Sequence, residues 1–299
     1  MKLLLLGCNG QVGWELQRAL QPLGEVIACD FDSPPETRAD FGDAAALAAL
    51  VERWQPAVIV NAAAHTAVDK AEGEPGLAEA LNAAAPALLA REAAARGAWL
   101  VHYSTDYVFD GGGDQPRRED APTGPRSVYG RTKLAGEQAI AASGCPHLIL
   151  RTSWVYAARG GNFARTMLRL AAERDALTVI DDQVGAPTGA DLLADVTAHA
   201  LRSAMAQPGL AGLYHCAAAG ETSWYGYARF VIEWARAHGQ ALRAAPDAVR
   251  PIATRDYPTP AARPLNSRLD CTKLQQAFGL RLPPWQSGVE RMLREVLGG

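Results

Sequence analysis

Cysteine is scarce in this chain of 299 residues, and the few cysteines follow no recognisable pattern. The five positions are odd in number, lie far apart and include no C-x-x-C pair. This distribution argues against a disulfide framework and against a structural zinc site. It predicts reduced thiols, as in a cytoplasmic protein.

The chain also lacks an excess of charge and any long hydrophobic run. Its formal net charge of −3 gives no electrostatic reason to expect a nucleic-acid or membrane partner. The run Leu3–Leu6 stops at Gly7, too short for a signal peptide or a membrane span, and predicts a buried strand. With 48% hydrophobic and 20% charged residues, the composition is that of a soluble globular protein.

Short apolar runs alternate with helical patterns in the first half of the chain. Helices are expected after Gly13, after a cap at Asp43, and at about 77–96 and 129–142. Strands are expected at Lys2–Leu6, Glu25–Asp30, Ala57–Asn61, Trp99–Tyr103 and His147–Arg151. This alternation, with continuously apolar strands, predicts an α/β fold with a doubly wound parallel sheet covered on both faces.

The pattern changes after about Thr152, where aromatic residues become denser and prolines cluster at 251–264. Further helices are expected at about 162–174, 191–204, 223–238 and 286–297. We therefore expect a dinucleotide-binding Rossmann domain over residues 1–152. Residues 153–299 would mainly form a smaller α+β domain that binds substrate at the carboxyl ends of the strands, and the two parts could interleave in sequence.

A glycine-rich turn follows the first expected strand and opens a helix. Gly7, Gly10 and Gly13 form G-x-x-G-x-x-G, whose glycines let the backbone approach a pyrophosphate at the helix N-terminus. A turn that merely connects a strand to a helix would look the same. Asp30, which ends the second strand, favours a dinucleotide because an acid there can accept hydrogen bonds from ribose hydroxyls.

Two further features bear on the cofactor. Asp30 favours NAD over NADP because it repels a 2′-phosphate, but Arg38 follows closely and could offset that repulsion. The preference between NADH and NADPH stays open. The segment Asn61–Ala64 follows the third strand, and its small residues would let a cofactor lie close; a helix start in an alanine-rich chain is an equal alternative.

A tyrosine and a lysine four residues apart, Tyr129 and Lys133, stand out because only 4 of the 29 basic residues are lysines. On a helix the ammonium would share a face with the tyrosine and lower its pKa by charge proximity. The tyrosine could then protonate an alkoxide as hydride arrives. Ser104 and Thr105, just after the fourth strand, could hold the substrate oxygen. By itself the pair favours function only modestly over an ordinary helix-start aromatic and a solvated surface charge, and the preceding hydroxyls strengthen the functional interpretation.

Seven segments from end to end make the sequence resemble the extended short-chain dehydrogenases/reductases, most closely those that reduce a dTDP-4-dehydro sugar. They are Gly7–Gln17, Val60–Glu72, Tyr103–Phe109 (YSTDYVF), Val128–Glu137 (VYGRTKLAGE), Arg151–Tyr156, Asp182–Thr188 (DQVGAPT) and Arg263–Leu269 (RPLNSRL). The last two segments carry the most weight because they lie outside the generic cofactor fold.

This resemblance implies reduction of dTDP-4-dehydro-β-L-rhamnose to dTDP-β-L-rhamnose by NADPH or NADH. It makes Tyr129 the proton donor, Lys133 the residue that tunes it and holds the nicotinamide ribose, and Thr105 the residue that positions the C4 carbonyl oxygen. Cofactor contacts are implied for Gly7, Gly10, Gln11, Val12, Gly13, Asp30, Asp40, Phe41, Ala63, Ala64, His65, Thr66, Tyr129 and Lys133. Substrate contacts are implied for Thr105, Asp106, Tyr129, Trp154, Arg263, Asn266 and Ser267.

Some of these residues also fit a purely structural role. Trp154 could equally belong to the core, and Arg263, Asn266 and Ser267 could form a self-satisfied loop network. An arginine is nevertheless well suited to the diphosphate of a dTDP-sugar, because its guanidinium group binds phosphate oxygens in pairs.

Members of this family often hold a magnesium ion with carboxylates at a dimer interface. Glu15 and Glu295 match two of those positions, and Asp191 stands where a longer glutamate is expected. The resemblance therefore also implies a homodimer and a magnesium site.

Two other functions remain as alternatives. One is a dehydratase or epimerase of nucleotide sugars; dehydratases commonly carry Asp-Glu directly after the threonine, whereas Thr105 is followed by Asp106 and Tyr107. The other is a nucleotide-binding regulatory subunit of the same fold, which need not keep the tyrosine, the lysine and the hydroxyl together.

Overall fold

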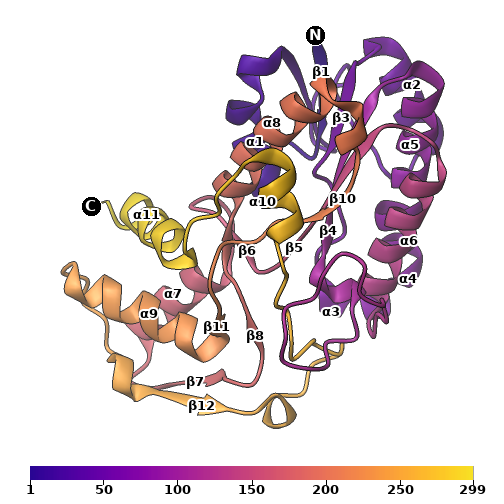
Figure 1. Ribbon diagram of the computed structural model, residues 1–299. Helices are drawn as coiled ribbons and strands as arrows, with labels where there is room; N and C mark the ends of the chain where they lie inside the picture. The colour runs from indigo at the N-terminus through magenta and orange to yellow at the C-terminus, as the bar shows by residue number, and fades with distance from the viewer. Residues whose placement is uncertain (299) are drawn as a thin grey trace.

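The computed structural model describes residues 1–298 and is built around a six-stranded parallel sheet (Figure 1). Its strands are β1 (Lys2–Leu6), β2 (Glu25–Cys29), β3 (Val58–Asn61), β4 (Trp99–Thr105), β5 (His147–Thr152) and β10 (Gly212–His215). They lie in the order β10-β5-β4-β3-β1-β2, and each neighbouring pair is parallel. After β2 the chain returns to the opposite side of β1, so the strand order reverses between β1 and β3.

The strands form because their apolar runs are buried on both faces. Leu3, Leu4, Leu5 and Leu6 are fully buried, and Val58–Val60 are as well. A strand with no solvent-facing side has no reason to alternate polar and apolar residues, which explains the continuous runs in the sequence. The predicted doubly wound α/β fold is confirmed.

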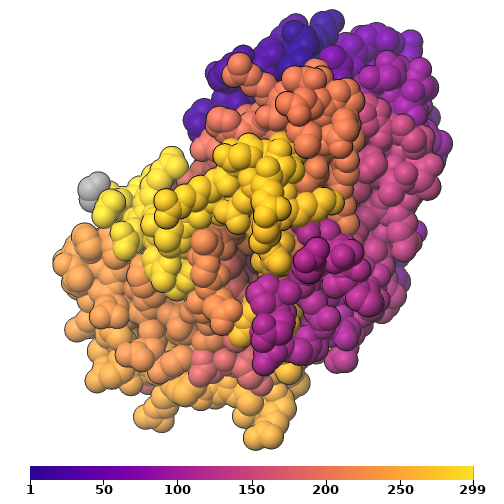
Figure 2. Space-filling view, in the orientation of Figure 1, coloured from indigo at the N-terminus to yellow at the C-terminus, as the bar shows by residue number. Residues whose placement is uncertain are grey.

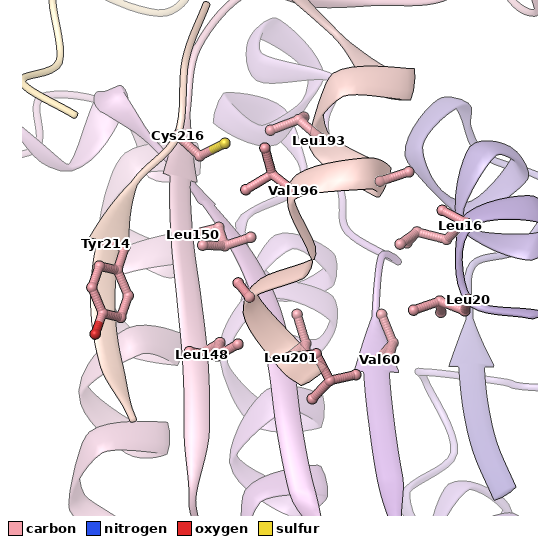
Figure 3. Close-up of a cluster of buried hydrophobic side chains, with 14 of the residues drawn as sticks. Leu16, Leu20, Val60, Leu148, Leu150, Leu193, Val196, Leu201, Tyr214 and Cys216 are labelled. Atoms are coloured by element: carbon pink, nitrogen blue, oxygen red, sulfur yellow. The ribbon is translucent and has the colours of Figure 1, made fainter. Parts of the chain in front are cut away.

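Helices cover the two faces of the sheet in separate layers. One layer contains α1 (Gln11–Ala19), α8 (Ala190–Ala206) and α10 (Thr272–Phe278). Figure 3 shows apolar side chains of α1, α8 and the sheet meeting in this layer, among them Leu16, Leu20, Leu193, Val196, Leu201, Val60, Leu148 and Leu150. The opposite layer contains α2 (Ala44–Trp54), α5 (Ala85–Arg96) and α6 (Val128–Ala142).

A second hydrophobic cluster lies beyond the carboxyl ends of the sheet. It joins α7 (Phe163–Glu173), α9 (Trp224–Ala237) and α11 (Trp285–Leu297) with the parallel pair β7 (Leu177–Ile180) and β12 (Val249–Ile252). Two short pairs complete this region: β6 (Val155–Tyr156) with β9 (Thr188–Gly189), and β8 (Val184–Gly185) with β11 (Thr222–Ser223).

The chain enters this second cluster and then returns to the sheet and the helix layer that contains α1. The elements α8, β10 and α10 all follow residue 152 in sequence, yet they pack with the sheet. Figure 2 shows the yellow C-terminal segment lying between an orange part of the surface next to the indigo and purple first half and the larger orange part below it. The core that we call the first core, formed by the sheet and the helix layer with α1, is therefore built from residues that precede and residues that follow 152 in the sequence.

The remaining helices are short. They are α3 (Val68–Gly73), α4 (Pro75–Glu79), a π-helical turn (Ala80–Ala84) and the 3₁₀ turns Gln21–Leu23, Asp106–Val108, Pro208–Leu210, Pro246–Ala248 and Thr254–Asp256. The π turn corrects the single helix expected over 77–96, which is instead α4, the π turn and α5. Pro86 has no N–H to donate to the carbonyl of Asn82 four residues earlier, so the regular helical ladder is interrupted there.

Local signals placed most other boundaries within a residue or two. Asp43 caps α2, accepting hydrogen bonds from the N–H groups of Ala45 and Ala46 at 3.0 Å each. Asn162 and Ser223, predicted as the first residues of helices, are the caps of α7 and α9. The sequence reasoning missed β10, α3 and α10, which are too short for a clear periodicity.

Two further properties concern the whole molecule. All five cysteines are buried free thiols. Across residues 1–298, every helix is too short or too polar to cross a membrane.

A buried ion pair joins α6 to the sheet. Arg151 on β5 donates from Nε and Nη2 to the two carboxylate oxygens of Glu137, at 2.8 and 2.6 Å, and both side chains are about 95% buried. The guanidinium also lies 5.0 Å from the ring centre of Phe109. Removing one partner of such a pair leaves a buried charge uncompensated.

We therefore expect Glu137→Gln to lower the free energy of unfolding by about 3–5 kcal/mol. Glu173→Gln is the matched control, because Glu173 pairs with Arg169 on an exposed helix surface and its loss should cost less than about 1 kcal/mol. Denaturant unfolding of both variants gives the comparison. Equal costs would show that burial of the Glu137 pair has no energetic consequence.

Candidate active site

The three glycines of the first turn differ in how strictly the structure requires glycine at each position. Gly7 has a φ of +81°, and a Cβ there would lie 2.6 Å from the backbone nitrogen of Ala63. A Cβ at Gly13 would lie 1.9 Å from the carbonyl oxygen of Gly7. At Gly10 the nearest atom would be 3.4 Å away, so the protein itself has room for a side chain there. Gly10 caps α1 without a side-chain hydrogen bond, which leaves the helix N-terminus open to an anionic group.

Asp30 lies at the end of β2, beside this turn. Its carboxylate accepts hydrogen bonds from the N–H of Asn9 at 2.9 Å and of Phe31 at 2.8 Å. Arg38 pairs with Asp30 through the backbone, and its guanidinium lies 4.9 Å from the ring centre of Phe31. An acid and a cation therefore share this rim.

A cleft of about 770 Å³ runs from the glycine turn along the carboxyl ends of β1, β3 and β4 to α6. Twelve of the predicted cofactor residues line it: Gly7, Gly10, Gln11, Val12, Asp30, Asp40, Phe41, Ala63, Ala64, Thr66, Tyr129 and Lys133. The hydroxyls of Ser104 and Thr152, from residues that also line it, are buried without a hydrogen-bond partner. Such orphaned donors fit a polar ligand like a dinucleotide.

Two of the predicted cofactor residues do not line the cleft. Gly13 packs beneath the turn against Gly7. His65 is buried; its N–H donates to the side-chain oxygen of Asn82 at 2.8 Å, and its Nε2 lies 3.3 Å from a carboxylate oxygen of Glu74. Both residues support residues that line the cleft without lining it themselves.

Helix α6 brings Lys133 under the end of β4. The lysine is buried; its Nζ donates to the carbonyl oxygen of Tyr103 at 2.6 Å and lies 3.2 Å from Nε2 of His102. Burial lowers the pKa of Lys133 to about 8, and the nearby carboxylate of Glu137 opposes the shift. The lysine is therefore held by the sheet and not solvated at the surface.

The structure adds two residues that the sequence reasoning missed. Asn61 and His102 are register partners on β3 and β4, and their side chains lie 3.1 Å apart (Nδ2 to Nδ1). Asn61 also accepts a hydrogen bond from the N–H of Ala63, which lines the cleft. A polar chain thus connects the wall of the cleft to Lys133. The available signal was a polar residue inside each of two otherwise apolar strands.

Tyr129 begins the first turn of α6, close to Thr105 and edge-on to Tyr107, with ring centres 5.5 Å apart. Burial raises the pKa of Tyr129 above its ordinary value, and the Thr105 hydroxyl opposes the shift. The expectation that Lys133 lowers this pKa was therefore wrong. The ammonium group is directed at Tyr103 and His102, and burial outweighs the remaining influences on the phenol.

Asp106 follows Thr105 and is almost completely buried. The Thr105 hydroxyl donates to its Oδ1 at 3.0 Å, while Oδ2 has no partner. Burial raises the pKa of Asp106 to about 6, and hydrogen bonds from Ser267 and Thr105 oppose the shift. These contacts place Ser267 next to Thr105 and Asp106, at one end of the cleft.

Two other predicted substrate residues, Arg263 and Asn266, differ in what their side chains contact. Arg263 pairs with Asp69 at 2.6 Å and donates to the hydroxyl of Tyr107 at 3.3 Å. Because the ring of Tyr107 packs against that of Tyr129, Tyr107 lies between Arg263 and the proposed proton donor. Asn266 is turned into a loop instead: its Nδ2 donates to the carbonyl of Gln115 at 2.9 Å. The Asn266 side chain therefore fits the loop network that the sequence left as an alternative.

The three carboxylates implied for magnesium come from α1, α8 and α11 but do not form a metal site. Burial raises the pKa of Glu15, and the charges of Asp191 and Glu295 add to that shift. Asp191 is engaged by Arg291 in an ion pair of 2.5 Å. Within residues 1–298, His, Cys, Asp and Glu side chains nowhere gather as a group of three or more that could hold a metal ion. The residues of a single chain therefore do not fit magnesium.

Comparison with known proteins identifies the family. The family model described as "RmlD substrate binding domain" matches residues 1–297. This chain belongs to that family. The dTDP-4-dehydrorhamnose reductase of Escherichia coli K12 is 56% identical over 296 residues, covering 99% of this chain and 98% of that protein. The enzyme of the same name from Burkholderia thailandensis is 46% identical over 301 residues, with 99% of both covered.

Solved structures agree with this assignment. A dTDP-4-dehydrorhamnose reductase from Clostridium acetobutylicum superposes with a TM-score of 0.89 at 35% identity, covering all of both chains. One from Bacillus anthracis, solved in complex with NADP, gives 0.86 at 32% identity, covering 98% of this chain and 99% of that one. A UDP-glucose 4-epimerase from Thermus thermophilus shares the fold, with a TM-score of 0.80 at 20% identity. The predicted resemblance to the extended short-chain dehydrogenases/reductases is confirmed.

The glycine turn gives a testable contrast. Gly13→Ala should destabilise the protein by about 1–3 kcal/mol, because the new Cβ would overlap the carbonyl of Gly7. Gly10→Ala should cost less than about 1 kcal/mol, since it only replaces one helix cap by a poorer one. Thermal or denaturant unfolding measures both. If Gly10→Ala proved as destabilising as Gly13→Ala, the conclusion that the protein has space for a Cβ at Gly10 would be wrong.

Proposed function

We propose that this protein reduces the C4 carbonyl of dTDP-4-dehydro-β-L-rhamnose to dTDP-β-L-rhamnose with NADPH or NADH, the last step of dTDP-L-rhamnose biosynthesis. The observation that carries the proposal is the convergence of Tyr129, Lys133 and Thr105 at the end of a dinucleotide-sized cleft. The full-length similarity to enzymes named for this reaction supports the choice of substrate.

The reaction needs a hydride at C4 of the sugar and a proton on its oxygen. A bound dihydronicotinamide supplies the hydride. Tyr129 is the proton donor, and its raised pKa suits that role because the phenol stays protonated at neutral pH. A reductase needs the tyrosine in its protonated form, because the tyrosine donates the proton. A lowered tyrosine pKa is therefore unnecessary before the substrate is bound.

Lys133 and Thr105 position the reacting groups. Lys133, fixed by Tyr103 and His102, lines the cleft where it can hold the nicotinamide ribose. The Thr105 hydroxyl, fixed between Asp106 and Tyr129, is placed to orient the C4 oxygen. Both groups are held by buried hydrogen bonds, which limits the reorganisation needed during reaction.

The remaining residues divide between the two ligands. The glycine turn and Asp30 would receive the pyrophosphate and the adenosine ribose. Arg263 would exchange its ion pair with Asp69 for the diphosphate of the sugar nucleotide. Residues 1–152 would thus serve the cofactor, and residues 153–299 mainly the sugar nucleotide. Asp30 and Arg38 on one rim are compatible with either NADH or NADPH.

We place the enzyme in the cytoplasm. All five cysteines are free thiols, as expected of a reducing compartment. The product would then be available to the enzymes that build rhamnose-containing polysaccharides such as O-antigen.

A different nucleotide-sugar reaction on the same fold is less consistent with the residues. The acid directly after Asp106 that a dehydratase would use is replaced by Tyr107. An epimerase must retain its cofactor through a cycle, so recovery of the protein with tightly bound dinucleotide would favour that reading.

The direct test is consumption of NADH and NADPH, in parallel, with enzymatically prepared dTDP-4-dehydrorhamnose. Loss of cofactor absorbance with dTDP-rhamnose as the product is expected. Cofactor binding without any consumption would remove the reductase activity and favour a regulatory role.

Tyr129→Phe should cut turnover by about 10²-fold or more while leaving cofactor affinity nearly unchanged, because only the proton is lost. Tyr214→Phe is the control: its hydroxyl donates to the carbonyl of Leu210 at 2.8 Å, and Tyr214 is not among the residues that line the cleft. Turnover and cofactor binding are measured for both. Wild-type-like turnover of Tyr129→Phe would remove this residue from the chemistry.

The pH profile should reflect Lys133 and not Tyr129. Below its pKa of about 8 the lysine is an ammonium group, so kcat should decline as pH rises through about 8. Tyr129 contributes no limb there because its pKa is raised. Lys133→Met should be slow and should lack this limb. A wild-type kcat that stays flat well above pH 8 would contradict the assignment.

A further inference from the structure

Trp154 has an unusual backbone. In residues 1–298, only Gln55 and Trp154 among the non-glycine residues have a positive φ, at 46° and 49°. Gln55 ends α2, where a left-handed residue is common. Trp154 ends no helix; it lies in the two-residue link between β5 and β6. A bulky side chain in this conformation is costly and persists only when its surroundings hold it there.

The surroundings of Trp154 are aromatic. Its ring is stacked on that of Trp224 from α9, with ring centres 3.6 Å apart and planes inclined by 14°. Phe163 of α7 packs on Trp224 in turn, at 4.6 Å. The stack therefore links the end of a sheet strand to two helices of the second hydrophobic cluster.

Hydrogen bonds fix the outer ring of the stack. Nε1 of Trp224 donates to Oε1 of Gln183 at 3.1 Å, and Nε2 of Gln183 donates to the hydroxyl of Thr254 at 3.1 Å. The N–H of Thr254 is bound by the carboxylate of Asp182 at 2.9 Å. Gln183 is itself buried. Trp224 thus has both its position and its rotation determined by partners outside the cleft.

The inner ring, that of Trp154, packs close to Gly185 and Ser267. Thr152 and Val155, on either side of Trp154, line the cleft. A Cβ at Gly185 would lie 2.9 Å from Cε2 of Trp154 and 3.0 Å from Cβ of Ser267. Ser267 in turn lies close enough to Asp106, the neighbour of Thr105, to influence its pKa. Trp154 remains only partly buried, although Trp224 is stacked on its ring.

We propose that Trp224, oriented by Gln183, is a positioning residue that fixes the strained Trp154 as a platform for the sugar ring of the nucleotide-sugar substrate. This inference rests on the proposed function. The C–H face of a pyranose and its methyl group are apolar, and a flat aromatic surface beside the carbonyl carbon would orient them for hydride transfer. Gly185 contributes by leaving room for the ring.

The proposal predicts a selective kinetic defect. Trp224→Leu should raise the KM for dTDP-4-dehydrorhamnose about tenfold, with the Kd for NADPH unchanged, because the stack lies on the sugar side of the site. Gly185→Ala should have the same effect without altering Trp224, since the added Cβ displaces the Trp154 ring. Trp224→Phe, which keeps a ring but loses the donor to Gln183, should fall between Trp224→Leu and the wild type.

Circular dichroism tests the stack without relying on activity. Two indoles stacked this closely, with transition moments that cross, should give an exciton couplet, which Trp154→Phe and Trp224→Leu should both abolish. The titration of wild-type protein with dTDP-rhamnose should change the couplet. Trp234→Leu is the matched control: it lies on the same helix and is stacked on His238 at 3.6 Å, so its loss should leave both the couplet and the KM unchanged.

The outcomes separate the two hypotheses. A couplet that disappears in Trp224→Leu while the KM for the sugar stays at the wild-type value would overturn the positioning role. A wild-type couplet that persists unchanged in both Trp154→Phe and Trp224→Leu would overturn the stack itself. If the wild type consumes no cofactor with the sugar but its couplet responds to dTDP-rhamnose, the platform stands and the proposed reduction fails.

Discussion

The close packing of α6 against two turns, the 3₁₀ turn Asp106–Val108 and the π turn Ala80–Ala84, sets the geometry on which the site depends. Two glycines allow it. A Cβ at Gly130 would lie 2.3 Å from the carbonyl of Tyr107, and one at Gly136 would lie 2.2 Å from the carbonyl of Asn82. With side chains at these positions the helix would have to move outward. Tyr129 and Lys133 would then lose their contacts with β4, because each is placed by the helix axis and not by a flexible loop.

This packing has an electrostatic consequence. Lys133 and Glu137 point from α6 toward the sheet, so both charges are taken out of water. Glu137 is compensated by Arg151 with two hydrogen bonds, whereas Lys133 faces only a carbonyl and an imidazole. The fold therefore stabilises one buried charge fully and leaves the other with a depressed pKa. The chemically versatile group is the one without a direct ion pair, although the carboxylate of Glu137 lies near enough to oppose the fall in its pKa.

The second hydrophobic cluster has a comparable relation to the site. It is connected to the sheet in the link between β5 and β6, where Trp154 has a strained backbone geometry and an aromatic partner from α9. The elements that return to the first core, such as α8 and β10, tie the two clusters together beyond that point. Substrate-side residues are thereby held against the cofactor side by packing, which suits a reaction between two bound molecules.

The sequence by itself determined what local pattern and motif can encode. The buried strands, the caps at Asp43 and Asn162, the glycine turn, and Tyr129 with Lys133 all follow from neighbours a few residues apart. Only the tertiary structure decided how distant residues meet. It paired Asn61 with His102, and it raised the tyrosine pKa that sequence reasoning expected to be lowered. The physical reason is that burial and hydrogen-bond direction depend on the packing of separate elements, which spacing along the chain does not specify.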